Sequence, residues 1–258
     1  MYMSKKLFNK LDAFLDNEPE PNELIDFVSE LVLSNDPTHK TIATRYSNIK
    51  KYLRENYIGI NEDTLKKLKP DDKIIQSIIE SDAEKKNNKK NIHFNKKNVE
   101  DILELKNSSN VYDKGIYLQF ISGRRINEIF DEDIKLTMLK NAPHKVKFSS
   151  LSKKTNDKPY VIQLVPDITA REFREEVYKL RKIVNGVSLN DWNKRINKRI
   201  KDKIGKDFTS HNLRGMYGVF LFNNHNDEDQ NINGFISKVL NHDSSDASLH
   251  YSNYIYKE

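Results

Sequence analysis

Residues 240–258, Leu240-Asn-His-Asp-Ser-Ser-Asp-Ala-Ser-Leu-His-Tyr-Ser-Asn-Tyr-Ile-Tyr-Lys-Glu258, organise the interpretation of the whole chain. Within them His242 stands nine residues before Tyr251. Two motifs upstream carry arginines, namely His211-Asn-Leu-Arg214 and Ser122-Gly-Arg-Arg-Ile-Asn-Glu-Ile129. A lysine-bearing segment lies between those motifs. The order along the chain is therefore Arg, Lys, His-x-x-Arg, His, Tyr, which suits the breaking of a phosphodiester by a tyrosine without a metal ion.

The chemistry explains why these residue types belong together. Attack of an oxygen on a phosphodiester builds negative charge on a five-coordinate phosphorus, which cations must stabilise when no metal does so. Arg125 and Arg214 suit this task, because a planar guanidinium binds two non-bridging oxygens at once. A free tyrosine titrates near ~10, so Tyr251 needs helpful neighbours to attack at neutral pH. His211 can accept its proton, a lysine can protonate the leaving 5′ oxygen, and His242 can donate a hydrogen bond to the phosphate.

The composition is that of a charged, cysteine-free protein. The 258 residues carry 44 Lys and Arg against 38 Asp and Glu, a net charge of +6 with an isoelectric point near 9.1. This excess fits a polyanionic partner such as double-stranded DNA. The absence of cysteine excludes a disulfide, a zinc–thiolate site and a cysteine nucleophile. No apolar run approaches the ~20 residues of a membrane span. We therefore expect no membrane partner and an intracellular location, in the cytoplasm or nucleoid, or in the nucleus or viral factory of a host cell.

The hydrophobic pattern predicts an α+β fold, mainly α with a small antiparallel β-sheet or hairpin. Residues 1–83 carry apolar stripes at helical spacing, and we expect them to form a helical domain that clamps DNA. Residues 84–98 are polar and contain three lysine pairs, which is typical of a flexible basic linker. Residues 99–258 then form a second domain that holds all the motifs above.

Two β-prone runs in this second domain, residues 145–152 and 159–165, predict a hairpin around the polar segment 153–158. A helix is expected to resume near Arg124 after the bend at Gly123. This arrangement would place Arg125 in a helix first turn, where backbone N–H groups favour an anion.

Basic residues outside the motifs are candidates for contact with DNA phosphates. They lie on one face of the predicted third helix, along the linker, and on the exposed face of a helix predicted over residues 191–204. These residues are Lys40, Arg45, Lys50, Lys51, Lys85, Lys86, Lys89, Lys90, Lys96, Lys97, Lys194, Arg195 and Lys198. The alternative for each group is an ordinary solvated surface.

Taken together, the motifs resemble those of the tyrosine recombinase (phage-type integrase) family. Residues 122–129 are similar to its first-arginine motif, residues 211–214 to its His-x-Leu-Arg box, and residues 239–242 with Tyr251 to its second histidine and nucleophile. Residues 1–83 are similar to the family's core-binding domain only in type and position. The resemblance implies a catalytic set of Arg125, Lys154, His211, Arg214, His242 and Tyr251. Lys153 is the alternative for the lysine, and Asn241 replaces the family's usual glycine.

The resemblance implies a site-specific recombinase that cleaves and rejoins DNA strands through a 3′-phosphotyrosine. It implies no metal, ATP or other cofactor, and a dimer or tetramer on double-stranded DNA. The Gly-Arg-Arg form of the first motif also resembles telomere resolvases, which make hairpin ends by the same chemistry. The motifs are compatible as well with a topoisomerase IB-like enzyme and with an inactive DNA-binding relative. The intact set argues against the inactive relative, because a pure binder needs neither Tyr251 nor Lys154. Tyr254 and Tyr256 remain alternative nucleophiles.

Overall fold

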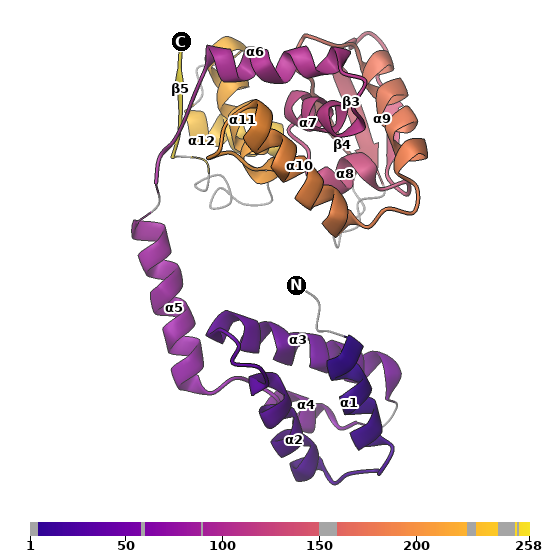
Figure 1. The fold of residues 1–258 in the computed structure, drawn as a ribbon, viewed down its shortest axis with the longest axis vertical. Coiled ribbons are helices and arrows are strands. Elements are labelled where there is room, and N and C mark those ends of the chain that lie inside the picture. The colour runs from indigo at the N-terminus through magenta and orange to yellow at the C-terminus, as the bar shows by residue number, and fades with distance from the viewer. Residues whose placement is uncertain are drawn as a thin grey trace. The chain divides into compact units, whose positions relative to one another are not determined.

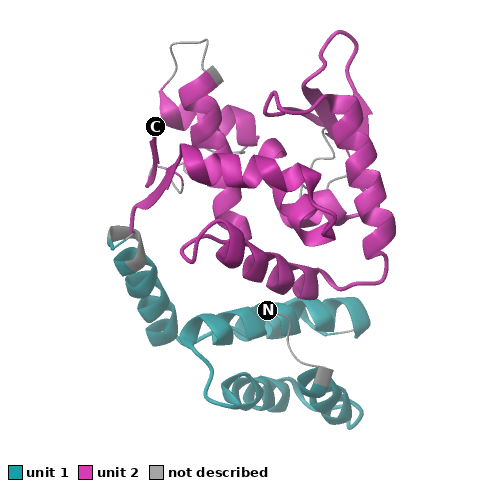
Figure 2. Cartoon of the chain, turned by 45° about the horizontal axis from the view of Figure 1, so that its top comes forward, with its two compact units in different colours: residues 1–89 teal, residues 90–258 magenta. Residues whose placement is uncertain are grey.

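The computed structural model describes residues 5–57, 60–88, 90–149, 159–225, 231–241, 251 and 253–258. The chain forms two compact units, which we call the N-terminal unit (residues 1–89) and the C-terminal unit (residues 90–258) and which are coloured separately in Figure 2. The predicted class is confirmed, since helices predominate and the sheets are small. Within the described part of the chain, no helix combines the length and apolar character that crossing a bilayer requires.

The N-terminal unit is built from helices. They are α1 (Lys5–Leu15), α2 (Pro21–Leu33), α3 (His39–Asn56), α4 (Glu62–Lys67) and α5 (Asp72–Asn87). Leu11, Val28, Ile49 and Leu53 are fully buried at the centre of its core. The apolar stripes that predicted this domain therefore face one another inside the unit.

The segment predicted as a flexible linker, residues 84–98, is mostly regular structure. Helix α5 continues to Asn87, strand β1 (Ile92–Asn95) follows, and helix α6 (Lys96–Glu104) begins directly after it. The boundary between the two units falls after residue 89. The reason is visible in the alternation around Phe94, which is only 2% exposed between polar neighbours, as expected of a half-buried strand.

The C-terminal unit contains the remaining elements. After β1 and α6 these are η1 (Leu105–Asn107), α7 (Val111–Ser122), α8 (Ile126–Phe130), β2 (Lys135–Met138), β3 (Lys145–Ser149), β4 (Tyr160–Gln163), α9 (Ala170–Val184), α10 (Leu189–Lys203), α11 (Ser210–His225), α12 (Ile232–Leu240) and β5 (Tyr254–Lys257).

Helix α7 is the centre of this unit. It contacts α6, α8, α9, α10 and α11, and Figure 1 shows these helices around it. Its sequence is apolar on all sides, and residues 115–122 are all buried. A helix of this kind must be enclosed by other elements, so its C-terminal end is held firmly in the interior. The residues that follow the C-terminal end of α7, from Gly123 onward, therefore start from a fixed position.

The predicted hairpin is part of a three-stranded antiparallel sheet in the order β2-β3-β4. Val146 lies opposite Ile162, and Phe148 opposite Tyr160, with all four side chains buried. Strand β2 was not predicted, because only one of its four residues, Leu136, is buried. The segment that carries Lys154 thus connects β3 to β4.

A second sheet joins the two ends of the C-terminal unit. Strand β1 pairs in parallel with β5, with Ile92 opposite Tyr254 and Phe94 opposite Tyr256. Asn253 strengthens the junction, because its side-chain Nδ2 donates to the carbonyl oxygen of Lys90 at 2.7 Å. The strand that follows Tyr251 is therefore fixed to the first strand of the same unit.

Two arginines, one partly and one fully buried, hold the surrounding helices. Arg199 on α10 forms a two-pronged ion pair with Asp113 on α7, with Nε–Oδ1 and Nη2–Oδ2 distances of 2.8 and 2.6 Å. Arg181 on α9 donates to the carbonyl oxygens of Glu128, Ile129 and Ile134. The carbonyls at the end of a helix carry partial negative charge, so Arg181 stabilises α8 in its place.

Candidate active site

The site begins at the turn between α7 and α8. Gly123 ends α7 in the left-handed conformation (φ 60°, ψ 19°). A Cβ atom at this position would lie 2.2 Å from Cδ1 of Tyr217, so only glycine fits. The next helix starts two residues later than predicted, at Ile126, so that Arg125 is the N-cap of α8 rather than part of its first turn. Its backbone N–H and its Nη1 both donate to Glu128, at 3.2 and 3.0 Å, while about half of its side chain remains exposed.

Arg124 is a buried partner of this turn that the sequence analysis did not single out. Its side chain is 1% exposed, and its Nη1 donates to the hydroxyl of Tyr160 at 2.6 Å. Its Nη2 donates to the carbonyl oxygen of Leu240 at 3.1 Å, and Glu128 lies 3.8 Å away. The Gly-Arg-Arg sequence with a glutamate four residues after the first arginine was the available signal. Arg124 thus links the turn to β4 and to the end of α12.

Arg214, on the buried face of α11, is held in a similar way. It is 2% exposed, and its Nη1 and Nη2 donate to the carbonyl oxygens of Gly123 and Leu240 at 2.6 and 2.8 Å. Its Nε atom is buried without a hydrogen-bond partner among the described residues. Burial lowers the pKa of Arg214 to about 10, and the charge of Arg124 acts in the same direction. The group therefore remains a cation at neutral pH.

Tyr251 lies beside this arginine. Its side chain is 4% exposed, and a Cβ atom at Gly215, the residue after Arg214, would lie 2.8 Å from its Cδ1. Tyr251 also acts to raise the pKa of Arg214, against the effect of burial. The ring of His211, in the first turn of α11, has its centroid 6.4 Å from the centroid of Tyr251. The structure thus brings Arg125, Arg214, His211 and Tyr251 to one site.

The other two predicted catalytic residues, Lys154 and His242, lie outside the described residues. Asn241, which replaces the family's glycine just before His242, is the C-cap of α12 in the left-handed conformation (φ 53°, ψ 58°). Asparagine is the residue that most often takes this conformation after glycine, so the substitution preserves the turn.

The predicted DNA-contact residues have different surroundings. On α10, Lys194 and Lys198 are exposed, while Arg195 contacts the hydroxyl of Tyr112. In the N-terminal unit, Lys40 is paired with Asp82, and Nη1 of Arg45 donates to two carbonyl oxygens at the end of α2.

The other predicted DNA-contact lysines are either paired with acids, exposed, or outside the described residues. Lys96 and Lys97 pair with acids one turn along α6, and Lys51 pairs with Glu55. Lys50 is partly exposed and Lys90 is exposed, whereas Lys89 and the side chains of Lys85 and Lys86 lie outside the described set. The hydrogen bonds of Arg45 thus give it a structural role, whereas Lys194 and Lys198 on α10 are exposed.

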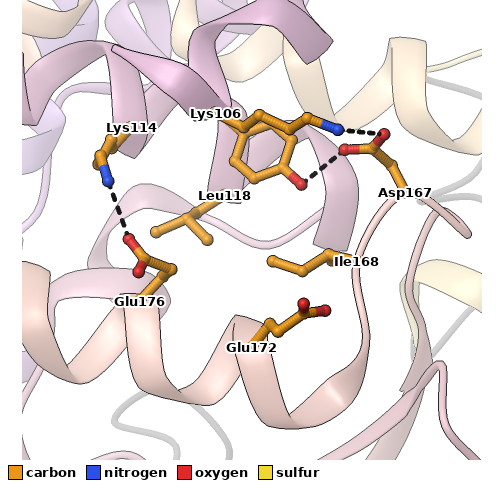
Figure 3. Close-up of a pocket in the computed structure, with 8 residues that line it drawn as sticks. Lys106, Lys114, Leu118, Asp167, Ile168, Glu172 and Glu176 are labelled. Atoms are coloured by element: carbon orange, nitrogen blue, oxygen red, sulfur yellow. Dashed lines mark hydrogen bonds and ion pairs between the residues drawn. The ribbon is translucent and has the colours of Figure 1, made fainter. Parts of the chain in front are cut away.

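A cavity of about 280 Å³ lies between α7 and α9 (Figure 3). None of the predicted catalytic or DNA-contact residues lines it. Lys106 pairs with Asp167 and Lys114 with Glu176, and Asp167 also accepts a hydrogen bond from Tyr117. Most charged side chains that line the cavity are thus paired with one another. Among the described residues, no group of three or more His, Cys, Asp or Glu side chains could hold a metal ion.

Comparison with known proteins gives a family and a fold. The family model described as the telomere resolvase ResT/TelK catalytic domain matches residues 86–254. A variant of protelomerase TelA covalently complexed with substrate DNA has a TM-score of 0.79 and 17% identity, over 99% of this chain and 90% of that chain. Another TelA variant, complexed with DNA hairpin product, has a TM-score of 0.79 and 16% identity at the same coverage.

Protelomerase TelK complexed with substrate DNA has a TM-score of 0.63 and 16% identity, over 98% of this chain and 58% of that chain. No curated protein sequence matches this chain. The resemblance inferred from the motifs is thereby confirmed, and the structural likeness extends over both units.

Proposed function

This chain belongs to the telomere resolvase ResT/TelK family, and we propose that it is a telomere resolvase that cuts a DNA duplex with Tyr251 and rejoins the ends as hairpins. The family is one of DNA breaking and rejoining enzymes related to tyrosine recombinases. A protelomerase with the same fold has been solved with a DNA hairpin product, which supports this proposal. From the motifs we expected strand exchange between duplexes first and hairpin formation second. The family match favours the opposite order.

The proposed reaction conserves the energy of the phosphodiester. The hydroxyl oxygen of Tyr251 attacks the phosphorus, the bond to the 5′ oxygen breaks, and a 3′-phosphotyrosine forms. The freed 5′ hydroxyl of the complementary strand then attacks the same phosphorus and displaces Tyr251. Each side of the cut becomes a hairpin, and the tyrosine regains its proton.

One observation carries the proposal, namely the position of Arg214 beside Tyr251. A buried cation whose neighbours fix it in place can stabilise charge that develops on the phosphate, because no reorganisation is needed during the reaction. Nη1 and Nη2 each donate to a carbonyl oxygen, and Nε, which has no partner among the described residues, is a further donor available to a phosphate oxygen. Arg125 adds a second guanidinium from the N-cap of α8, where backbone donors also favour an anion.

The proton transfers are assigned to the other members of the set. His211 accepts the proton of Tyr251, to which its ring is the neighbouring base. Lys154, on the connection between β3 and β4, protonates the leaving 5′ oxygen. His242 donates a hydrogen bond to a phosphate oxygen from the position after the Asn241 turn.

The stoichiometry of the reaction favours a homo-oligomer on DNA. Two strands must be cut, and each chain supplies one Tyr251, so at least two copies are required. The mass of the protein–DNA complex in solution, compared with that of the free chain, tests this. A complex that contains one chain and still yields hairpins would exclude it.

The exposed lysines of α10 are proposed to contact the DNA backbone. Replacing Lys198 by alanine should weaken binding to all sequences and lower the slope of log affinity against log salt by about 1. Lys179 on α9 is a matched control, because it is exposed but paired with Glu176 at 2.8 Å. Equal slopes for the two variants would place the DNA elsewhere.

Covalent trapping tests the function directly. Wild type and Tyr251→Phe are mixed with DNA of the source organism or element, denatured in detergent, and the DNA that remains attached is sequenced. We expect adducts with wild type alone, at a recurrent inverted repeat. A duplex carrying that site should then yield products that remain linked after alkaline denaturation, as hairpins do. Joints between two duplexes would indicate strand exchange, relaxed circles a topoisomerase, and binding without adducts an inactive relative.

A further inference from the structure

Tyr254, three residues after the proposed nucleophile, is fixed against it. Its side chain is 6% exposed, and its ring centroid lies 5.7 Å from that of Tyr251. Its hydroxyl accepts a hydrogen bond from Nδ2 of Asn212 at 2.9 Å. Asn212 belongs to the first turn of α11, between His211 and Arg214. The contact therefore joins the strand after Tyr251 to the helix that carries the other groups of the site.

The orientation of Asn212 is set by a second pair of contacts. Its Oδ1 accepts from the backbone N–H and from the hydroxyl of Thr209, at 2.7 and 2.6 Å. A backbone N–H can only donate, so the amide oxygen must face Thr209 and the amide nitrogen is left for Tyr254. The donor that holds Tyr254 is thus part of the N-terminal end of α11.

Gly215 provides the space for both tyrosines. A Cβ atom there would lie 2.5 Å from Cζ of Tyr254 and 2.8 Å from Cδ1 of Tyr251. Glycine weakens a helix interior compared with alanine, so its presence here needs a reason. The reason supplied by the structure is the close approach of the two rings to α11, next to Arg214.

The opposite side of Tyr254 is held by the β1–β5 sheet. Tyr254 pairs with Ile92, and the N–H of Ile92 donates to the carbonyl oxygen of Asn253 at 2.8 Å. Tyr254 is consequently held by the sheet at its backbone and by Asn212 at its hydroxyl. The ring of Tyr251 lies against that of Tyr254 and against Gly215, the residue after Arg214 in α11.

We propose that Tyr254 is a positioning residue that holds the ring of Tyr251 against α11, beside Arg214 and His211. This inference rests on the proposed role of Tyr251 as the nucleophile. It also assigns a role to a residue that the sequence left as an alternative nucleophile. Burial raises the pKa of Tyr254 to about 12, although the hydrogen bond from Asn212 acts to lower it, so its hydroxyl stays protonated.

The test compares two substitutions that each delete one hydroxyl from the same strand. Tyr254→Phe removes the acceptor of Asn212 and keeps the ring. Tyr256→Phe is the matched control, because that ring packs on Phe94 and Phe220. The substrate is a duplex oligonucleotide with the sequence recovered by covalent trapping. Single-turnover adduct formation, DNA affinity and the unfolding temperature are measured for wild type, both variants, Asn212→Ala and the double variant Asn212→Ala with Tyr254→Phe.

We expect Tyr254→Phe to slow adduct formation at least about fivefold, the factor that corresponds to one hydrogen bond, with DNA affinity unchanged. Tyr256→Phe should react like wild type. The double variant should be no slower than the slower single variant, because both changes break the same contact.

Three results would overturn the proposal: a wild-type rate for Tyr254→Phe, equal slowing by Tyr256→Phe, or a rate loss that merely follows lost DNA affinity and folding. Adducts on Tyr254 in Tyr251→Phe protein would overturn it too. Absence of adducts with wild type would instead remove the proposed function, and this inference with it.

Discussion

Arg124 and Arg214 donate to the same acceptor, the carbonyl oxygen of Leu240, at 3.1 and 2.8 Å. Leu240 is the last residue of α12, where a carbonyl has no partner within the helix and carries partial negative charge. The carbonyl oxygen of Leu240 thus accepts hydrogen bonds from one arginine of each of the two arginine motifs. Leu240, which directly precedes Asn241 and His242, is therefore bonded to both arginines.

Arg214→Ala should lower DNA cleavage by about 10²–10³-fold, as does the loss of a preorganised donor to a developing oxyanion. DNA binding should change much less, because the charge that Arg214 stabilises develops only during cleavage. The measurement is single-turnover cleavage beside a binding titration. Arg171→Ala, at an exposed position on α9, is the control and should cleave normally. Loss of the folded state in Arg214→Ala, seen by circular dichroism, would instead indicate a role in folding alone.

Gly215→Ala should reduce cleavage at least about tenfold, because a displacement of a reacting group by 1 Å can cost 10²-fold. The added Cβ would overlap the rings of Tyr251 and Tyr254. Gly218→Ala is a matched change one turn along the same helix, where the nearest atom is the flexible Cγ1 of Ile236 at 3.3 Å. We expect that variant to cleave like wild type, and similar rates for both alanine variants would refute the steric argument.

Asn241 can be tested by its backbone conformation. Asn241→Gly should leave the free energy of unfolding nearly unchanged, since glycine adopts positive φ without strain. Asn241→Ala should lower it by about 1 kcal/mol or more, the cost of the left-handed conformation for an ordinary residue. Urea unfolding of the three proteins measures the difference. Alanine and glycine variants of equal stability would show that the turn relaxes.

The Asp113–Arg199 pair predicts a pH dependence of stability. Burial acts to raise the pKa of Asp113, but hydrogen bonds from Arg199 and Ser108 outweigh it and leave the pKa below its ordinary value. The stabilisation is complete above the unfolded-state pKa of about 3.9 and is lost as pH falls through the lower folded-state value. Asp113→Asn should be less stable than wild type at neutral pH and lose less on acidification. Parallel stability curves below about pH 4 would contradict this.

Helical segments and motifs could be predicted from the sequence, because periodic apolar residues and local motifs are readable without the fold. The structure brings Arg125 and Arg214, which the motifs singled out, to one site with Tyr251 and His211, and their catalytic roles stay predictions. Strands β1 and β5 could not be predicted, since each has four residues and gains its stability from a partner far along the chain.

Arg124 escaped prediction for a different reason. Arginines are usually exposed, and only the tertiary structure supplies Tyr160 and Leu240 as partners that make burial favourable. Gly215 was likewise invisible, because a glycine inside a helix has meaning only when the neighbouring rings are known. Both residues report packing between distant segments, which one sequence does not reveal.

The pairing of β1 with β5 has a consequence for the order in which the unit folds. Lys90 and Asn253, which hydrogen-bond across this junction, are 163 residues apart in the sequence. Contacts of such long range form late, because the entropy of closing the loop must be overcome before they contribute. We therefore expect the pairing of β1 with β5 to form late in the folding of this unit. A partly folded chain without this pairing would lack part of the support of Tyr251, so we expect the capacity to cut DNA to arrive only with the completed fold.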